Sequence, residues 1–151
     1  MLVTLSHIQN LHLNQLQSLI DNSKTEGYKM VQRLWDEYES GKNRFDTGGA
    51  ILLAVYQDDV MIGIGGVHPD PYLNDPKIGR VRHVYVLPKH RRTGIGRQLI
   101  SELIENSRAT FHTLTLRTLT ERGDKFYKSL GFSDEPRYDD VTHWLELKDE
   151  D

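Results

Sequence analysis

The spacing of apolar and polar residues predicts a strand and two helices in the first third of the chain. Residues 1–5 are a short apolar run typical of a strand, and residues 11–20 carry apolar side chains at helical spacing. A second helix is predicted over 26–39, where the apolar side chains share one broad face. The polar, glycine-containing stretch 42–49 then predicts a loop.

The middle of the chain predicts three strands in succession. Residues 51–56 and 60–67 are apolar and rich in β-branched side chains, and they enclose a polar turn at 57–59, which predicts a hairpin. Three prolines indicate a loop at 68–76, and residues 80–86 form the next predicted strand.

The last third alternates helices with strands. Residues 98–109 carry an apolar stripe at helical spacing, 114–118 predict a strand, and 121–130 predict a short helix that Gly131 ends. Residues 141–147 alternate apolar and polar side chains and predict a closing strand. The order β-α-α-β-β-β-α-β-α-β predicts an α/β fold with a mixed central sheet flanked by helices.

Length and composition are typical of a single globular domain. The 151 residues fit one domain, 1–151, in which residues 148–151 are expected to form a frayed acidic end. Hydrophobic residues make up 37% and charged residues 27%, and no apolar run approaches the roughly 20 residues of a membrane span. No signal peptide is evident. We therefore expect a cytoplasmic protein that does not enter a membrane.

Cysteine and histidine usage limits the chemistry. The chain has no cysteine, which excludes disulfides, thiolate metal sites and a cysteine nucleophile. Its 7 histidines are scattered, without a His-x-x-x-His pair on a helix, so we expect no metal site. A covalent cysteinyl intermediate is likewise excluded.

A basic, glycine-containing turn between the strand at 80–86 and the helix at 98–109 predicts a phosphate-binding loop. Its sequence over residues 91–96 is Arg-Arg-Thr-Gly-Ile-Gly. Glycines let the backbone approach an anion, and the first N–H groups of a helix point toward it. The charge pattern agrees, because residues 77–97 hold seven Lys or Arg and no Asp or Glu in a chain of net charge −3.

Two other phosphate-binding patterns are absent. A Walker loop requires Lys and then Ser or Thr after its last glycine, but Gly96 is followed by Arg97 and Gln98. The dinucleotide fingerprint requires a third glycine at position 99, which is Leu99. An Arg-x-x-Gly-x-Gly pattern remains.

This pattern resembles the acyl-CoA pyrophosphate loop of the GNAT superfamily of N-acetyltransferases. The strand that ends in Tyr-Val-Leu-Pro at 85–88, immediately before the loop, strengthens the resemblance. A second segment, Lys-Phe-Tyr-Lys-Ser-Leu-Gly-Phe at 125–132, is similar to the family helix that ends in Phe-Tyr-x-x-Leu-Gly-Phe. The motifs and the strand between them cover residues 79–132, whereas the N-terminal third matches only in its order of elements.

The resemblance implies that the protein uses acetyl-CoA as a co-substrate and acetylates a primary amine by direct transfer in a ternary complex. In the family, the strand before the loop holds the pantetheine arm and supplies an oxyanion donor, and the loop binds the pyrophosphate. Tyr127 matches the tyrosine that commonly protonates the departing CoA sulfur, and Thr120 stands where the family often has an asparagine. The expected cofactor-binding residues are Val84, Tyr85, Val86, Arg91, Arg92, Thr93, Gly94, Ile95, Gly96, Arg97 and Thr120.

The general base has several candidates. The family often places a glutamate in the strand before the loop, but Arg80 and Arg82 occupy the corresponding positions, and Thr115 stands where some relatives carry one in the next strand. His83 is the nearest titratable residue, and an imidazole near its ordinary pKa of about 6.5 can accept a proton. The alternatives are a water chain and the side chains of His68, His143 and Glu102.

The resemblance also implies that the early helices and the loop after them shape the acceptor groove. Within residues 28–45 the candidate walls are Trp35, Tyr38 and Phe45, although core packing explains the same aromatic residues. The acidic side chains of the second helix either attract a cationic amine or form a solvated face. The expected acceptor is a small-molecule or peptide amine, and the expected assembly is a monomer or homodimer.

Two other functions remain open from the sequence. The fold can bind acyl-CoA without catalysis and act as a sensor or interaction domain, which the missing strand glutamate favours and Tyr127 disfavours. An RNA-binding α/β domain is supported only by the basic residues of 77–97 and by Tyr85 as a stacking partner. Nucleic acid is not favoured, because the rest of the chain is acidic and the cations are confined to one strand, turn and helix.

Overall fold

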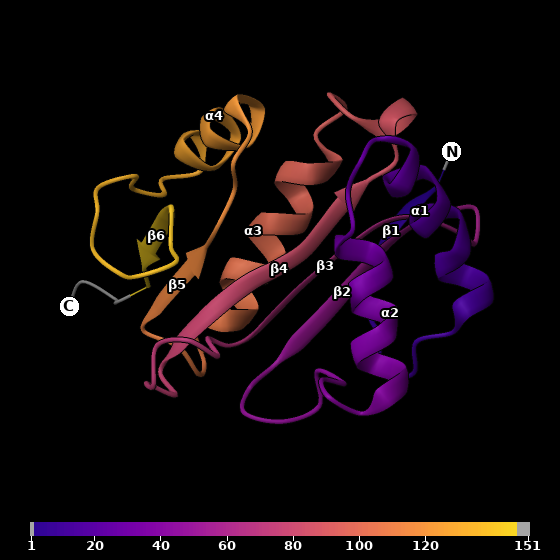
Figure 1. Cartoon of the computed structure of the whole chain (residues 1–151). Helices are drawn as coiled ribbons and strands as arrows, with labels where there is room; N and C mark the ends of the chain where they lie inside the picture. Colours follow the sequence, from indigo (N-terminus) through magenta and orange to yellow (C-terminus); the bar gives the residue numbers. More distant parts are fainter. Residues whose placement is uncertain (1, 148–151) are drawn as a thin grey trace.

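A six-stranded mixed sheet forms the centre of the computed structural model, which describes residues 2–147 (Figure 1). The strands lie in chain order and are antiparallel, except for a parallel pair formed by the fourth and fifth. They are β1 (Val3–His7), β2 (Ile51–Gln57), β3 (Val60–Pro69), β4 (Ile78–Val86), β5 (Thr113–Leu116) and β6 (His143–Glu146). Residue 1 and the predicted frayed end at 148–151 lie outside the described residues.

Four α-helices of the described chain cover this sheet. They are α1 (Leu13–Thr25), α2 (Met30–Ser40), α3 (Ile95–Ser107) and α4 (Glu121–Ser129), with a short 3₁₀ helix at Pro88–His90. Helices α1 and α2 lie on one face of the sheet and α3 on the other, while α4 lies above β5 (Figure 1). The observed order confirms the predicted α/β fold with its mixed central sheet.

Two consecutive glycines in β3 show how closely the layers approach. A Cβ added at Gly65 would lie 3.4 Å from Leu99 and 3.3 Å from Leu103 of α3, whereas one at Gly66 would lie 2.5 Å from Phe45. Because successive strand residues point to opposite faces, both faces of the sheet are covered at its centre. This explains why β2 and β3 are almost continuously buried and apolar rather than alternating.

The first two helices are divided at a different place from the prediction. Helix α1 runs past its predicted end, and Glu26 caps its C-terminus. Gly27 follows with φ +84°, a left-handed conformation that favours glycine, so the chain turns there before α2 begins at Met30. The prediction of a helix over 26–39 is therefore wrong at its start, where the chain instead connects two helices.

Other predicted boundaries shift by a few residues. Helix α3 begins at Ile95 rather than at residue 98, because Gly94 occupies its N-terminal cap in the left-handed conformation, with φ +88°. Strand β5 ends at Leu116, short of its predicted end. The first turn of α3 is thus built from the glycine motif itself.

Candidate functional site

An opening separates β4 from β5 along the second half of β4. The two strands pair only where Ile78–Arg80 meets Thr113–Thr115, although β4 continues to Val86. Beyond Arg80, no strand within residues 2–147 pairs with this edge of β4. The backbone of residues 84–86 therefore has an open side at which an extended ligand can bind.

A β-bulge bends β4 beside this opening. Two residues of β4, His83 and Val84, lie opposite the single residue Gly65 of β3. His83 has φ +61°, in the left-handed region that histidine enters more readily than most residues. Bulges bend a strand and re-aim its side chains, and this one lies where β4 has already left β5.

The glycine loop presents backbone donors at the start of α3. The N–H groups of Ile95, Gly96 and Arg97 have no acceptor among the described residues, and the first helical bond runs from Gln98 N to Gly94 O at 3.0 Å. A Cβ added at Gly94 would meet nothing within 4 Å, so the space before the helix is open. Unpaired N–H groups at the positive end of a helix dipole form a site for an anion.

Arg91 anchors the loop to the connection between α1 and α2. Its guanidinium donates to both carboxylate oxygens of Glu26, at 2.8 and 2.7 Å, and its Nε donates to the Val86 carbonyl at 2.9 Å. The Tyr85 hydroxyl donates to the same carboxylate, and the Arg91 guanidinium lies over the Tyr85 ring.

The pKa values of this cluster follow from its contacts. The hydrogen bond from Arg91 is the main cause that lowers the pKa of Glu26 to about 2. Burial and then Glu26 raise the pKa of Tyr85 to about 12. Sequence reasoning missed Glu26, because it lies 65 residues from Arg91 and no local pattern marks it.

Two other side chains of the loop, Thr93 and Arg97, bond within the protein, whereas that of Arg92 does not within residues 2–147. Thr93 Oγ1 donates to the His90 carbonyl at 2.6 Å, and Arg97 donates to Ser129 Oγ of α4 at 2.8 Å. Arg92 is exposed, and no residue in the described part of the chain pairs with its side chain. Arg92 is therefore the loop arginine whose charge is available to an anion.

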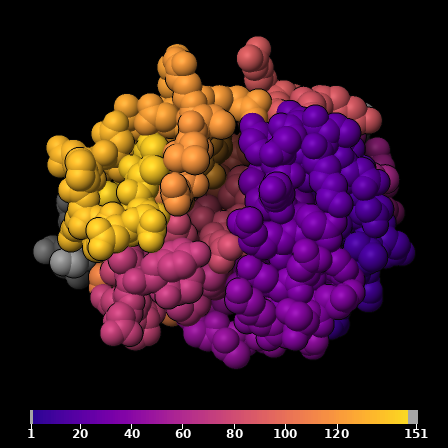
Figure 2. Space-filling model, viewed as in Figure 1, coloured from indigo at the N-terminus to yellow at the C-terminus, as the bar shows by residue number. Residues whose placement is uncertain are grey.

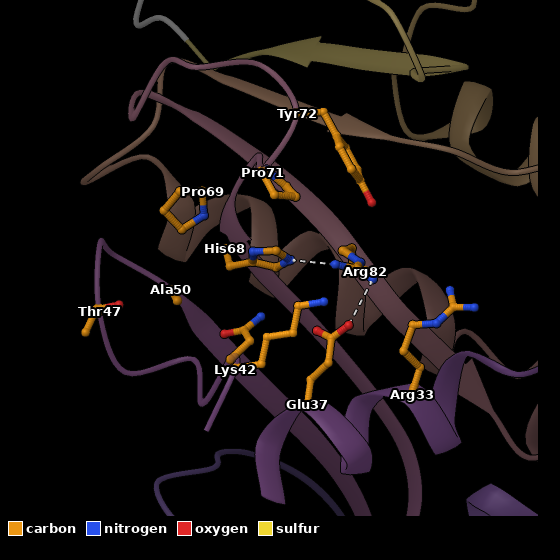
Figure 3. A pocket seen from close by; sticks show the side chains of 11 residues that line it. Arg33, Glu37, Lys42, Thr47, Ala50, His68, Pro69, Pro71, Tyr72 and Arg82 are labelled. Carbon is orange, nitrogen blue, oxygen red and sulfur yellow. Dashed lines mark hydrogen bonds and ion pairs between the residues drawn. The ribbon is translucent and has the colours of Figure 1, made fainter. Parts of the chain in front are cut away.

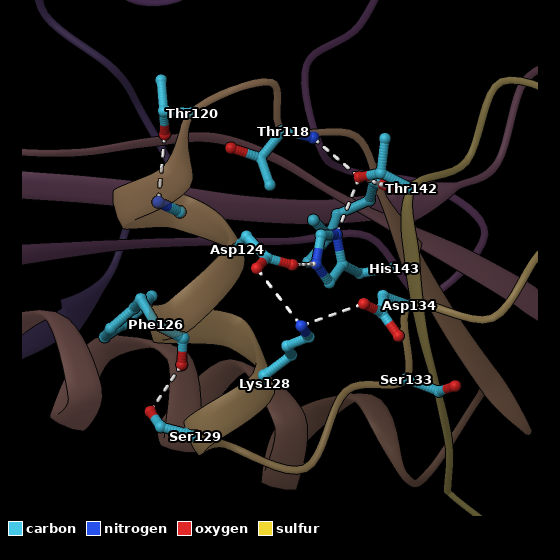
Figure 4. Close-up of polar contacts among 12 residues, drawn as sticks. Thr118, Thr120, Asp124, Phe126, Lys128, Ser129, Ser133, Asp134, Thr142 and His143 are labelled. Carbon is cyan, nitrogen blue, oxygen red and sulfur yellow. Dashed lines mark hydrogen bonds and ion pairs between the residues drawn. The ribbon is translucent and has the colours of Figure 1, made fainter.

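Helix α4 contributes a threonine and a tyrosine to this region. Thr120 caps the helix by accepting a hydrogen bond from Gly123 N at 3.0 Å (Figure 4). The Tyr127 ring packs against Phe126 and Phe132, with centroids 5.1 and 5.5 Å apart, and burial raises the pKa of Tyr127. Its hydroxyl has no hydrogen-bond partner within residues 2–147. A phenol that stays protonated and unpaired can donate its proton to a ligand.

His143 is held beside α4 by two neighbours. Its Nε2 lies 2.8 Å from Asp124 Oδ1, and its Nδ1 lies 2.8 Å from Thr142 Oγ1 (Figure 4). Lys128 joins Asp124 and Asp134 at 3.3 and 3.0 Å in the same cluster. These contacts fasten α4 to the first residue of β6 and to the segment before that strand, and they engage both nitrogens of a histidine that the sequence offered as a base.

A pocket lies on the side of the sheet that α2 covers. Figure 2 shows a groove between the α1–α2 part and the α4–β6 part of the molecule, with β4 at its floor. The pocket has a volume of about 690 Å³. It is lined by Arg33, Glu37, Lys42, Asn43, Thr47, Ala50, His68, Pro69, Pro71, Tyr72 and Arg82 (Figure 3).

The strand opening, the glycine loop and α4 lie within one segment that a known family covers. The family model for the acetyltransferase (GNAT) domain matches residues 48–134. The chain belongs to this family. The resemblance carried by the two motifs is therefore confirmed over more than half of the GNAT chain.

Solved structures extend the GNAT likeness to nearly the whole chain. A protein from Exiguobacterium sp. 255-15, assigned as an acetyltransferase, is 27% identical, with a TM-score of 0.82 over 97% of this chain and 94% of that chain. A GNAT-family acetyltransferase from Staphylococcus aureus Mu50 is 15% identical, with a TM-score of 0.76 over 97% and 100%. The protein yncA from Salmonella typhimurium, assigned as an acetyltransferase and solved with its cofactor acetyl-CoA, is 18% identical, with a TM-score of 0.71 over 98% and 95%. The last two show the shared fold.

In this GNAT domain, a buried network around Asp70 engages Arg80 and Thr115, two of the positions where the family often carries a glutamate. Arg80 Nη1 lies 3.2 Å from Asp70 Oδ2, and Thr115 Oγ1 donates to the same oxygen at 2.6 Å. Arg80 Nη2 donates to the Asp140 carbonyl at 2.8 Å. The side chains of Arg80 and Asp70 are only 7% and 0% exposed, so this network serves the packing of the sheet rather than an open reaction site.

The other candidates for a base are enclosed or distant. His83 is 5% exposed, its Nδ1 lies 2.9 Å from the Met30 carbonyl, and its Nε2 is buried without a partner in the described chain. Burial is the main cause that lowers the pKa of His83 to about 3 and that of His68 to about 4. Glu102 lies on α3, on the face of the sheet away from the pocket. The base role expected for His83 therefore has no open proton route in this geometry.

None of the aromatic residues expected to wall the acceptor groove lines the pocket, and Trp35 and Tyr38 are half-buried against the core. Trp35 and Tyr38 stack with centroids 6.1 Å apart, and the Tyr38 hydroxyl accepts a backbone N–H at 3.0 Å. Phe45 is 6% exposed and packs in the core. The pocket uses Arg33 and Glu37 of α2, so the helical spacing identified the helix but not the face that meets the groove.

Three of the seven cations in the basic segment 77–97 pair with carboxylates within the protein, namely Arg80, Arg82 and Arg91. Arg97 keeps its charge and donates to a serine. The pairing of three arginines weakens the support for a nucleic-acid surface. Across residues 2–147, no helix has the length and apolarity to cross a membrane, and no group of three or more potential metal-ligating side chains is found.

Proposed function

We propose that the protein transfers an acetyl group from acetyl-CoA to a primary amine by direct attack in a ternary complex. The observation that carries this proposal is that two open backbone surfaces belong to consecutive elements. One is the edge of β4 that leaves β5 after Arg80, and the other is the start of α3, where N–H groups are unpaired. An extended ligand arm that ends in phosphates fits this pair. The family, and a relative solved with acetyl-CoA, support the same ligand.

The loop residues suit the pyrophosphate of acetyl-CoA. The N–H groups of Ile95, Gly96 and Arg97 can converge on one anion, and Arg92 adds a positive charge without breaking an existing pair. Thr120 keeps a hydroxyl hydrogen to donate while its oxygen caps α4. The ligand therefore binds groups whose bonding capacity the protein leaves unused.

The edge of β4 at 84–86 and Tyr127 serve the transfer itself. Acetyl-CoA supplies a thioester that a neutral amine can attack. A backbone N–H of this edge stabilises the negative charge that develops on the thioester oxygen, an effect typically worth about 10²–10³ in rate. Tyr127 donates its proton to the sulfur as the carbon–sulfur bond breaks, because its hydroxyl has no partner within residues 2–147 and is protonated at neutral pH.

The proton that the amine loses leaves through water in this proposal. Arg80 and Thr115 are engaged with Asp70, and His83 is enclosed, so none of them takes it directly. The cations that line the pocket assist, because positive charge disfavours the ammonium form of a bound amine. Direct transfer agrees with the absence of cysteine from the chain.

Cofactor binding is tested by the stability of the protein in the presence of CoA. At 100 times its dissociation constant, CoA should add about 2.7 kcal/mol to the free energy of unfolding, and adenosine far less. Gly94→Glu should abolish this gain, because it places a side chain and a negative charge at the anion site. Gly41→Glu is the matched control, since Gly41 has a similar φ of +82° at the end of α2. An unchanged gain in Gly94→Glu would locate the cofactor elsewhere.

Catalysis is tested by release of CoA thiol from acetyl-CoA with a panel of amines. We expect release that depends on the amine and is lost in Gly94→Glu. Stabilisation by CoA without thiol release for any amine would instead support an acyl-CoA sensor. Stabilisation by a random RNA but not by CoA would support a nucleic-acid-binding domain.

A further inference from the structure

The pocket on the α2 side carries more positive than negative charge. Arg33, Lys42 and Arg82 line it together with one carboxylate, Glu37. Three cations and one anion leave two net positive charges, because His68 is neutral at pH 7 with its pKa lowered to about 4, first by burial and then by Arg82. The chain as a whole has a net charge of −3. A local charge opposite to that of the whole protein indicates an anionic ligand.

Two of the three cations are free to bind that ligand. Arg82 Nη2 lies 3.7 Å from Glu37 Oε2, and Arg82 Nη1 lies 3.4 Å from His68 Nε2, so part of the guanidinium is already engaged within the protein. Arg33 and Lys42 are exposed, and neither side chain has an ion pair or hydrogen bond within residues 2–147. Figure 3 shows Lys42 and Glu37 reaching into the pocket from the same side, across from the pocket wall that holds the prolines. Two unpaired cations among the residues that line one pocket suit a carboxylate.

The pocket adjoins the reaction site proposed above. Arg82 lines the pocket and also stands in β4, directly before the bulge at His83 and Val84. The volume of about 690 Å³ falls within the roughly 300–1,000 Å³ of small-molecule sites. A small molecule in this pocket therefore lies beside Arg82, the residue that connects the pocket to the bulged part of β4.

We propose that the acetyl acceptor is a small primary amine that carries a carboxylate, as a free amino acid does. This inference rests on the proposed acetyl transfer and names its substrate class. The carboxylate binds Arg33 and Lys42, and the amine is directed past Arg82 toward the open edge of β4. A polyamine or an aminoglycoside carries only positive charge and is repelled by the same side chains.

The same charges act on the proton that the amine must lose. Because like charge disfavours the ammonium form, the pocket lowers the pKa of the bound amine and increases its neutral, reactive fraction. The acceptor carboxylate holds the molecule in place against this repulsion. The two effects together allow a neutral amine to form without a carboxylate base, because Arg80 and Arg82 occupy the positions where that base is expected.

Matched acceptor pairs test the role of the carboxylate. Release of CoA thiol would be followed with each proteinogenic L-amino acid and with the carboxamide of the same amino acid. The carboxamide has the less basic amine, so more of it is neutral near pH 7 and its intrinsic reactivity is favoured. For the preferred amino acid we nevertheless expect the free acid to react faster than its carboxamide, with kcat/KM at least about tenfold higher.

Substitutions in the pocket test which residues recognise the carboxylate. The double variant Arg33→Gln, Lys42→Gln removes both free cations, and glutamine suits α2 at position 33 as well as the exposed loop at position 42. Its kcat/KM for the free acid should fall about tenfold or more, mainly through KM, and the preference over the carboxamide should disappear. The KM for acetyl-CoA should stay the same. Lys77→Gln removes an exposed cation outside the pocket and should behave as the unsubstituted protein does.

The outcomes separate this inference from the proposed function. Equal or faster turnover of the carboxamides, or an acid preference that survives in the double variant, would overturn the inference and leave acetyl transfer intact. If no amine is turned over, the proposed reaction is wrong. Binding of amino acids to the pocket then tests whether Arg33 and Lys42 recognise a carboxylate. In that case amino acids added with CoA must raise the unfolding temperature more than their carboxamides do, and only when Arg33 and Lys42 are present. Absence of that difference overturns the inference as well.

Discussion

The side chains of the candidate site divide into those that bond within the protein and those that do not. Arg91, Arg97 and Thr120 each bond to another part of the chain. Arg92 and the Tyr127 hydroxyl have no hydrogen-bond partner among the described residues. The proposed roles therefore fall on groups that have unused hydrogen-bonding capacity, such as the Tyr127 hydroxyl.

Tyr127→Phe tests the proton donor, because it keeps the ring and removes only the hydroxyl. With a working acceptor, kcat should fall by roughly 10²–10³, within the usual range of general acid catalysis. CoA affinity should barely change, since the loop of α3 is untouched. Steady-state kinetics and CoA titration measure the two quantities. Equal turnover in the two proteins, with chemistry rate-limiting, would leave Tyr127 as a packing residue.

The pH–rate profile tests the base. Because His83 is buried and its pKa is lowered to about 3, it stays neutral through the working range and should contribute no inflection there. We expect an inflection that moves with the amine pKa when two acceptors are compared. His83→Asn should keep this profile, since asparagine also tolerates the φ of +61°. An inflection near pH 6.5 that disappears in the variant would restore His83 as the base.

An ion pair between elements joins the α1–α2 connection to the glycine loop. Glu26 and Arg91 form it, with side chains 27% and 21% exposed. Solvent reaches both groups, so the pair contributes about 1 kcal/mol or less to stability. The ion pair holds the glycine loop in place, because Arg91 also donates to the carbonyl of Val86, the last residue of β4.

The pH dependence of stability tests this ion pair. The folded-state pKa of Glu26, about 2, lies below its ordinary value of 4.5, so the stabilisation is complete above pH 4.5 and is lost as the pH falls toward 2. Glu26→Gln should therefore lower the free energy of unfolding by about 0.5–1 kcal/mol at pH 7, and by less at pH 3. Urea unfolding at both pH values measures the difference. Glu102→Gln is the control, and a gap that is the same at both pH values would contradict the assignment.

Across the whole molecule, the buried network of Asp70 and Arg80 ties distant segments together. It joins the end of β3, strand β4, Thr115 of β5 and the carbonyl of Asp140 before β6. The network closes β4 against β5 at the one place where those strands pair, and the strands separate beyond it. The opening that suits a cofactor therefore begins where this network ends.

Asp70→Asn tests the network through global stability. The substitution leaves the Arg80 guanidinium, 7% exposed, without its charge partner, and breaking a buried pair in this way typically costs about 3–5 kcal/mol. Urea unfolding should show a loss of this size. Asp59→Asn in the β2–β3 turn, where φ is +69°, should change stability by about 0.5 kcal/mol or less. A comparably small loss at position 70 would mean that Arg80 is satisfied by its other contacts.

Local sequence patterns are sufficient to predict the order of elements, the mixed sheet, the glycine loop and the segment that carries Tyr127. These are properties of neighbouring residues, since apolar periodicity, turn-forming glycines and unpaired helix N–H groups arise within a few positions of one another. Residue types alone could not show that 26–29 connects two helices. Gly27 ends a helix only where the chain adopts a left-handed turn, and the sequence does not show whether it does.

Contacts between distant segments determine which side chains stay accessible and which are enclosed. The tertiary structure paired Glu26 with Arg91 across 65 positions and Thr115 with Asp70 across 45, it enclosed His83, and it turned Arg33 and Glu37 of α2 toward the groove. Burial and charge pairing depend on what distant segments bring to the same place, and no local pattern records that. The family and the glycine loop were therefore evident from sequence, whereas the charge of the pocket beside α2 appeared only when α2, β3 and β4 came together.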